Sequence, residues 1–216
     1  MILNITNGDY FNRYFLEKLN TQYLGNALPF REAMIQGDTK KEVFSDEFIQ
    51  TRALALSVSE DFYREKAEDI LNLANTHQNY EKLQLWFGKD SFCQLNLLTL
   101  LAFLEKIAYQ GELSLFIIDD ESFAVIEKDI KIQLGNYQKL YETILIDKKM
   151  PSNFGIIYKK AVELYFDYLS PDGALAQFIL ENKEKSEDTL MKELLLRTKE
   201  YGLSDSNILS LIQRIL

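Results

Sequence analysis

The sequence has only one cysteine and one histidine, Cys93 and His77, and these shortages exclude several kinds of site. A single cysteine cannot form an internal disulfide or build a thiolate metal cage. A Ser-His-Asp or Cys-His mechanism would depend on His77 alone, which lies in the polar run 75–79, a predicted loop. The sequence therefore disfavours both catalytic mechanisms, and we predict no metal site built from cysteine and histidine ligands.

The chain is also short of basic residues relative to acidic ones. It has 24 Lys/Arg and 33 Asp/Glu, which gives a net charge of −9 and a pI of about 4.8. This balance argues against nucleic acid as the main partner. Residues 1–130 hold 12 basic and 21 acidic side chains, whereas residues 131–150 hold four and two. The acidic excess serves solubility or forms a functional face, and both interpretations stay open.

Long apolar runs are absent as well. No window reaches the length of a membrane span, and Met1 is not followed by a basic segment and a long apolar stretch. We therefore expect a soluble cytoplasmic protein with no membrane association. The 47% apolar and 12% aromatic content is ample for a core, and 216 residues fit one large domain or a medium domain with a smaller one.

The chain is organised around residues 83–104. This stretch predicts a buried strand, a tight turn at Gly88-Lys89-Asp90, and then a strongly apolar helix over 92–108. Asp90 and Gln94 would lie at the carboxyl end of the strand, where open α/β sheets bind ligands. The broad apolar surface of the helix fits a core or an interface. Cys93, inside the apolar run, is better explained as core than as a nucleophile.

A second strand–turn–helix unit begins the chain. Residues 2–6 predict a strand and residues 10–19 a helix, with Asn7-Gly8-Asp9 between them. Asp9 is the predicted N-cap, because its carboxylate can accept from free N–H groups of the first turn. Backbone N–H groups above Gly8 suit an anion, and the alternative is a capped helix with nothing bound.

Basic side chains follow in two places. After a predicted strand at 23–28, Arg31 could clamp a phosphate or carboxylate, with Glu32 as its partner, as an acid/base group or as a solvated helix start. Two helices then begin at the predicted caps Ser45 or Asp46 and Ser59. Arg52, in the first helix, could reach the site or form a surface salt bridge.

A strand over 112–118 ends in Asp119-Asp120, so carboxylates follow three predicted strands. If the strands are parallel, these carboxylates share one edge of the sheet and could hold Mg²⁺, which makes Mg²⁺ the cofactor to test. The alternative is that they are ordinary turn and cap residues. The pattern predicts an α/β fold in which helices flank a mostly parallel sheet, a Rossmann-like three-layer arrangement.

After residue 130 the pattern becomes helical, so we predict an α/β domain over 1–130 and an all-helical domain over 131–216. The predicted helices cover 137–146, 153–169, 171–182, 186–200 and a last segment from Ser204. The sequence from Gly202, a glycine stop followed by a capping serine and an amphipathic segment, is typical of a helix-turn-helix. Its only basic residue is Arg214, so helical packing explains it better than DNA binding.

Several short segments together resemble a bacterial family, domain of unknown function 1835, followed by its helical companion, domain of unknown function 3658. The matching segments are Ile5-Thr6-Asn7-Gly8-Asp9, Pro29-Phe30-Arg31-Glu32-Ala33, Arg52-Ala53, Leu85-Trp86-Phe87, Asp90 with Gln94-Leu95, Leu134-Gly135 and Gly202-Leu203-Ser204. The resemblance implies the same domain division and site positions. It implies no reaction, because the family has no established activity. The family tends to have glutamate-histidine-aspartate after the Trp-Phe pair, where this chain has Gly88-Lys89-Asp90.

Three functions follow as hypotheses. The first is a site for a small anionic ligand, a nucleotide or sugar phosphate. Its predicted residues are Asn7, Gly8, Asp9, Arg31, Glu32, Arg52, Asp90 and Gln94. Asp9, Glu32 and Asp90 are the candidates for catalysis, and whether the protein is an enzyme stays open. The second is a regulatory module whose helical domain binds a protein partner or forms a homodimer. The third is a Mg²⁺-dependent phosphoesterase.

Overall fold

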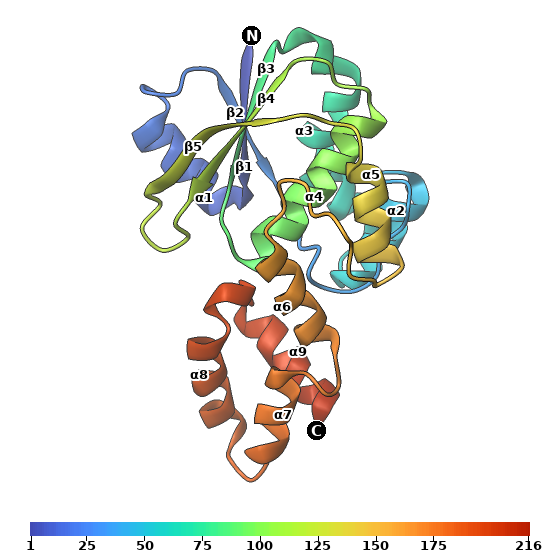
Figure 1. Ribbon diagram of the computed structural model, residues 1–216, viewed down its shortest axis with the longest axis vertical. Coiled ribbons are helices and arrows are strands. Elements are labelled where there is room, and N and C mark those ends of the chain that lie inside the picture. The colour runs from blue at the N-terminus through green and yellow to red at the C-terminus, as the bar shows by residue number, and fades with distance from the viewer.

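The structure, a computed structural model, describes residues 1–216 and has two lobes (Figure 1). The upper, α/β lobe comprises residues 1–146, and the lower, helical lobe comprises residues 159–216. The strands are β1 (Ile2–Asn7), β2 (Asn26–Phe30), β3 (Lys82–Phe87), β4 (Glu112–Ile118) and β5 (Val125–Ile132). The helices of the α/β lobe are α1 (Gly8–Tyr14), α2 (Asp46–Ala55), α3 (Glu60–Thr76), α4 (Ser91–Lys106) and α5 (Tyr137–Tyr141). Those of the helical lobe are α6 (Lys159–Leu169), α7 (Ala174–Glu181), α8 (Glu187–Arg197) and α9 (Asp205–Ile215).

The sheet has the strand order β2-β1-β3-β4-β5. The first four strands pair in parallel, and β5 runs antiparallel to β4. Because the parallel strands share one direction, their carboxyl ends meet at one edge. The predicted α/β class with a mostly parallel sheet is confirmed.

Both faces of strand β3 are buried, which shows that the sheet is covered by a layer of helices on each side. Alternate residues of a strand point to opposite faces. Leu85 and Phe87 join the main core beneath α3 and α4, whereas Trp86 faces α1 in a smaller aromatic cluster. There its ring stacks on Phe116 at 4.1 Å between centroids. The sheet is therefore covered by α1 on one face and by α3 and α4 on the other.

The predicted strand at 23–28 is corrected by the structure, because β2 begins at Asn26 and runs through Pro29 to Phe30. A proline removes a backbone donor, which a central strand cannot tolerate. Strand β2 is an edge strand that pairs with β1 alone, so Pro29 fits there.

Strand β5 was not predicted. Its sequence, VIEKDIKI, is half charged, and most of its residues are exposed. It is recognisable only through its pairing with β4. The predicted domain boundary after residue 130 falls inside this strand, and α5 lies against α4 in the α/β lobe (Figure 1).

Helix α4 is the centre of the molecule. It is buried from Ser91 to Leu104 apart from Phe92, and it contacts β3, α5 and α6. The helical lobe lies below its first turn, next to the carboxyl edge of the sheet (Figure 1). Ser91 Oγ donates to the Ala161 carbonyl at 2.7 Å and joins α4 to α6.

The helices of the helical lobe occur in the predicted order, but two of them begin later in the sequence than predicted. Helix α6 begins at Lys159 rather than near 153, and α7 begins at Ala174. The last helix has the predicted cap, because Ser204 accepts from the Asn207 N–H and forms a capping box with it. None of the helices combines the length and the apolar character needed to cross a bilayer.

Candidate functional site

The strand order makes the boundary between β1 and β3 a topological switch point of the sheet, and we call this position the crevice. The helix that follows β1 covers one face of the sheet, and the helix that follows β3 covers the other. At such a switch point the connections diverge and leave space above the carboxyl ends of the strands. Asn7 ends β1, and Gly88 follows β3.

Four side chains meet at this crevice. Asn7 Nδ2 donates to Cys93 Sγ at 2.9 Å, and that thiol donates to Asp120 Oδ1 at 3.4 Å. Asp90 Oδ1 accepts from the Cys93 N–H at 2.8 Å and caps α4. The side-chain ligand atoms of Asp90, Cys93 and Asp120 all lie within 4.8 Å of one another. We call these four residues the crevice cluster.

The turn after β4 brings Asp120 into the cluster. Asp119 accepts from the N–H and hydroxyl of Ser122 and closes the turn. Phe123 has a left-handed φ of 59°, a strained conformation for an aromatic residue, and its ring packs against Tyr10, Phe11 and Tyr14 of α1. Gly88 completes the arrangement, because a Cβ there would collide with the Asp120 carboxylate.

Asp120 is exposed as a residue, but partial burial of its carboxyl group and the neighbouring Asp90 carboxyl raise its pKa to about 8. The Asp120 carboxyl therefore holds a proton at neutral pH, since its ionisation next to another carboxyl group is unfavourable. Burial also raises the pKa of the Cys93 thiol well above its usual value. A neutral, buried thiol is a poor nucleophile.

The carboxylates predicted to bind Mg²⁺ come together only in part. Asp90 and Asp120 meet, whereas Asp119 binds Ser122 and Asp9 binds Arg31. Mg²⁺ prefers oxygen ligands, and a thiol lies between the two carboxyls. This donor set suits Zn²⁺ better than Mg²⁺.

Asp9 is not the N-cap of α1, contrary to the prediction. The helix begins at Gly8 directly after β1, so Asn7 occupies the cap position, without a side-chain capping bond. The Asp9 carboxylate instead accepts from Arg31 Nε at 2.8 Å. Arg31 also donates to the Lys66 carbonyl at 3.0 Å and lies 3.7 Å from Asp69. Both members of the Asp9–Arg31 pair are partly exposed at the carboxyl edge of the sheet.

Glu32 and Arg52 form a buried ion pair away from solvent. Arg52 donates to Glu32 Oε1 through Nε at 3.2 Å and Nη2 at 3.0 Å, and its side chain is 0% exposed. It also binds the carbonyls of Ala33, Gln36 and Asp38. The other Glu32 oxygen accepts from the Tyr63 hydroxyl at 2.5 Å, a partner that the sequence did not reveal. These groups are thus occupied in holding the loop after β2.

Gln94 joins the turn after β3 to Tyr158, the N-cap of α6 at the start of the helical lobe. Its side chain is buried, donates to the Gly88 carbonyl at 2.6 Å and accepts from the Tyr158 N–H at 3.1 Å. Close to it, Lys89 pairs with Glu127 at 2.6 Å, and the Tyr158 hydroxyl donates to the same carboxylate. Gln94 therefore fixes the turn after β3 and does not face the crevice cluster.

Asn96 was not predicted as a site residue. A carboxamide in an otherwise apolar helix is nevertheless a recognisable signal in the sequence. Its Nδ2 donates to Asn7 Oδ1 at 2.9 Å and to the Glu32 carbonyl at 2.5 Å, and its Oδ1 accepts from the Met34 N–H. It therefore fixes the ends of β1 and β2 relative to α4.

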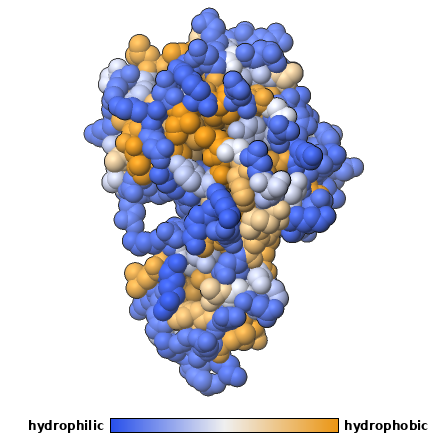
Figure 2. Space-filling model, viewed as in Figure 1, coloured by the Kyte–Doolittle hydropathy of each residue, from blue (hydrophilic) through white to orange (hydrophobic).

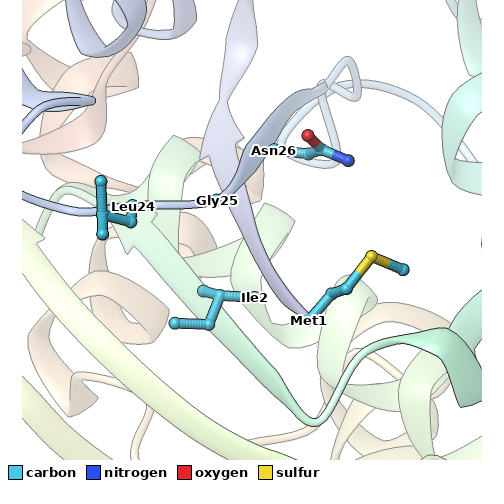
Figure 3. Close-up of a pocket in the computed structure, with 5 residues that line it drawn as sticks. All are labelled: Met1, Ile2, Leu24, Gly25 and Asn26. Carbon is cyan, nitrogen blue, oxygen red and sulfur yellow. The ribbon is translucent and has the colours of Figure 1, made fainter.

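A separate pocket lies at the opposite edge of the sheet (Figure 3). It is a cavity of about 280 Å³ lined by Met1, Ile2, Leu24, Gly25 and Asn26. The side chains of Ile2 and Leu24 lie on one side of Gly25, and those of Met1 and Asn26 on the other. These residues begin β1 and β2, so the pocket is remote from the crevice cluster. His77, in a short 3₁₀ helix before β3, also belongs to this edge.

In comparisons with known proteins, no family model matches this chain and no curated protein matches it significantly. The resemblance to the domain of unknown function 1835 family therefore stays a prediction.

Proposed function

We propose that the protein binds a small anionic ligand, a nucleotide or sugar phosphate, over the crevice between β1 and β3. The observation that carries this proposal is the alignment of polar side chains at four neighbouring strand ends. Arg31 follows β2, Asn7 ends β1, Asp90 follows β3 and Asp120 follows β4. The lobes also meet at this edge, and ligand sites are common where two domains meet.

The strand spacing sets the size of the ligand. Neighbouring strands lie about 4.8 Å apart, so β2 and β4 are roughly 14 Å apart across three spacings. A ligand that contacts both Arg31 and Asp120 therefore has the dimensions of a nucleotide rather than of inorganic phosphate. Figure 2 shows a gap between the two lobes that is bordered mainly by hydrophilic residues, which suits such a polar guest.

The chemistry assigns a role to each end of the crevice. Exposed ion pairs are weak, so a phosphate can replace the Asp9 carboxylate at Arg31. Asp120, the exposed member of the cluster, can donate a hydrogen bond to the ligand when its carboxyl is protonated and can accept from ligand hydroxyl groups. Glu32, Arg52 and Gln94 hold the surrounding loops, the Asp9 carboxylate is displaced by the phosphate, and Asp90 is covered by Gly202. The proposed contacts are therefore Asn7, Gly8, Arg31 and Asp120.

Isothermal titration calorimetry with nucleotides and sugar phosphates, with and without Mg²⁺, tests this proposal. Arg31→Gln should weaken binding at least tenfold. Arg64→Gln is the matched control, because Arg64 is a partly exposed arginine whose ion-pair partner is Asp46 and which has no hydrogen bond to Arg31 or the crevice cluster. If no compound binds, or if Arg31→Gln binds as tightly as the unmodified protein, the proposal fails.

Mg²⁺-dependent phosphoester hydrolysis is supported less well. Two-metal chemistry requires ions about 3.5–4 Å apart, held by several convergent oxygen ligands. Asp90 and Asp120 supply two such ligand groups, and Cys93 occupies the third place in the cluster. The ligand panel with Mg²⁺ also tests this function through release of phosphate.

A second candidate function is protein association through the helical lobe. Four leucines there, Leu180, Leu195, Leu196 and Leu216, are exposed, and Leu196 is 76% exposed. Figure 2 shows hydrophobic residues at the surface of this lobe. Light scattering after size-exclusion chromatography should reveal a dimer that Leu196→Gln dissociates. Leu54→Gln is the control, because Leu54 is 81% exposed on α2, and a monomer at all concentrations would count against self-association.

A further inference from the structure

A second cavity lies beside α5, in the yellow-to-orange part of Figure 1. It is an open groove of about 700 Å³ between the end of β5, α5 and the segment that leads to α6. Its lining residues are Gln133, Leu134, Gly135, Asn136, Tyr137, Lys139, Leu140, Thr143, Lys149, Met150, Pro151, Ser152, Asn153 and Gly155. Ligand pockets usually measure about 300–1,000 Å³.

The groove differs in charge from the rest of the molecule. The chain carries a net charge of −9, yet the lining contains two lysines and no acidic residue. Lys139 forms no ion pair. Lys149 lies 3.7 Å from Asp147 in a pair whose side chains are 73% and 53% exposed, which contributes little stability. Both ammonium groups are therefore available to an anion.

The backbone at the groove is already fixed by the protein itself. The Glu105 carboxylate accepts from the N–H groups of Gly135, Tyr137 and Gln138. These backbone donors at the start of α5 therefore already have a hydrogen-bond partner. On the far wall Gly155 has a φ of 57° and lies against the Tyr137 ring. The two walls thus touch, and the groove is formed before any ligand arrives. The lysines, and not the N-terminus of α5, would therefore bind the negatively charged group of a ligand.

We propose that this groove is a second binding site, which takes a small molecule that carries a phosphate or carboxylate next to an apolar ring. Lys139 and Lys149 bind the anionic group. Leu134, Leu140 and Met150 contact the apolar part, and the neighbouring amide and hydroxyl groups fix its orientation. The site is independent of the crevice, because β5 ends at the amino edge of the parallel strands, where Ile132 pairs with Leu113.

Adenosine 5′-monophosphate is a suitable probe, since it combines both chemical features, and inorganic phosphate and adenosine represent each feature alone. NMR titration of the full chain should show shifts at residues 133–155, with adenosine 5′-monophosphate binding more tightly than either part. The double variant Lys139→Gln/Lys149→Gln should weaken this binding at least tenfold. The control with the same charge change is Lys159→Gln/Lys160→Gln at the exposed start of α6.

Two further outcomes decide between the sites. Binding at the groove should persist in Arg31→Gln, and binding at the crevice should persist in the Lys139/Lys149 double variant, so either proposal can fail alone. The groove proposal is overturned if adenosine 5′-monophosphate gives no shifts at 133–155. It is equally overturned if both double variants lose the same affinity, which would indicate non-specific attraction.

Discussion

Gly202, in the helical lobe, lies directly against the carboxylate of Asp90, in the α/β lobe. A Cβ at Gly202 would collide with Asp90 Oδ1 and with the Cβ of Phe92. The residue also has a left-handed φ of 68°, as expected for a glycine that ends a helical turn. One glycine therefore allows both the turn before α9 and the close contact of the lobes at the crevice cluster.

Gly202→Ala should destabilise the protein through both effects. A left-handed conformation alone costs an alanine about 1–2 kcal/mol. Gly8→Ala isolates that cost, because Gly8 has a φ of 80° and no atom near its missing Cβ. Urea unfolding should show a larger loss for Gly202→Ala than for Gly8→Ala. Equal losses would mean that the contact with Asp90 contributes nothing.

Gln94 supports the same junction and gives a second prediction. Gln94→Glu keeps the shape of the side chain but replaces the amide that donates to the Gly88 carbonyl. A buried acceptor without a partner costs about 1–3 kcal/mol, and more when it is charged. The free energy of unfolding should fall by at least that amount. The control is Gln110→Glu, since Gln110 is exposed and donates to a carbonyl two residues away. Similar small effects of both substitutions would contradict a joining role for Gln94.

Local patterns predicted much of the fold. Ser45 and Ser59 cap α2 and α3 as expected, because a cap depends on residues within one helical turn. The alternation in β3 and the apolar length of α4 likewise report burial directly. Strand β5 was not recognised, since an exposed, half-charged edge strand is defined by the hydrogen bonds to its neighbour rather than by its own composition.

The candidate site was predictable to the extent that it depends on strand ends. Parallel strands bring Asn7 and Asp90 to one edge, and the same rule accounts for Asp120. The contributions of Cys93 and Asn96 depend on the rotation of α4 about its axis, which the apolar pattern does not specify because nearly every face of this helix is buried. Glu32 and Arg52 gave no sign of their burial, since they are distant from each other in sequence and Tyr63, the second partner of Glu32, is more distant still.

The raised pKa of Asp120 predicts a pH dependence of stability. Asp120 has an ordinary pKa of 3.8 when unfolded and a pKa of about 8 in the fold. Between these values the folded protein binds more protons, so this contribution is complete below about pH 4 and is lost as the pH rises toward 8. Asp120→Asn stays neutral throughout. Urea unfolding at several pH values should show the difference in stability, unmodified protein minus variant, decreasing as the pH rises. Parallel pH profiles would show that Asp120 does not hold the proton.

The buried Glu32–Arg52 pair gives the last prediction. Removal of one partner from a buried pair costs about 3–5 kcal/mol, because the remaining charge is left without compensation. Glu32→Gln should therefore destabilise the fold by that amount. Tyr63→Phe, which removes one hydrogen bond to the carboxylate, should cost about 1.5–3 kcal/mol.

The control for that pair is Arg64→Gln, which breaks an exposed ion pair with Asp46 and should change stability by no more than about 1 kcal/mol. If Glu32 acts on a ligand instead, Glu32→Gln would leave unfolding nearly unchanged and weaken ligand binding. Chemical denaturation and calorimetry on the same variants separate these outcomes. A large stability loss with binding affected only in proportion to the unfolded fraction would assign Glu32 to the framework that holds the loop after β2.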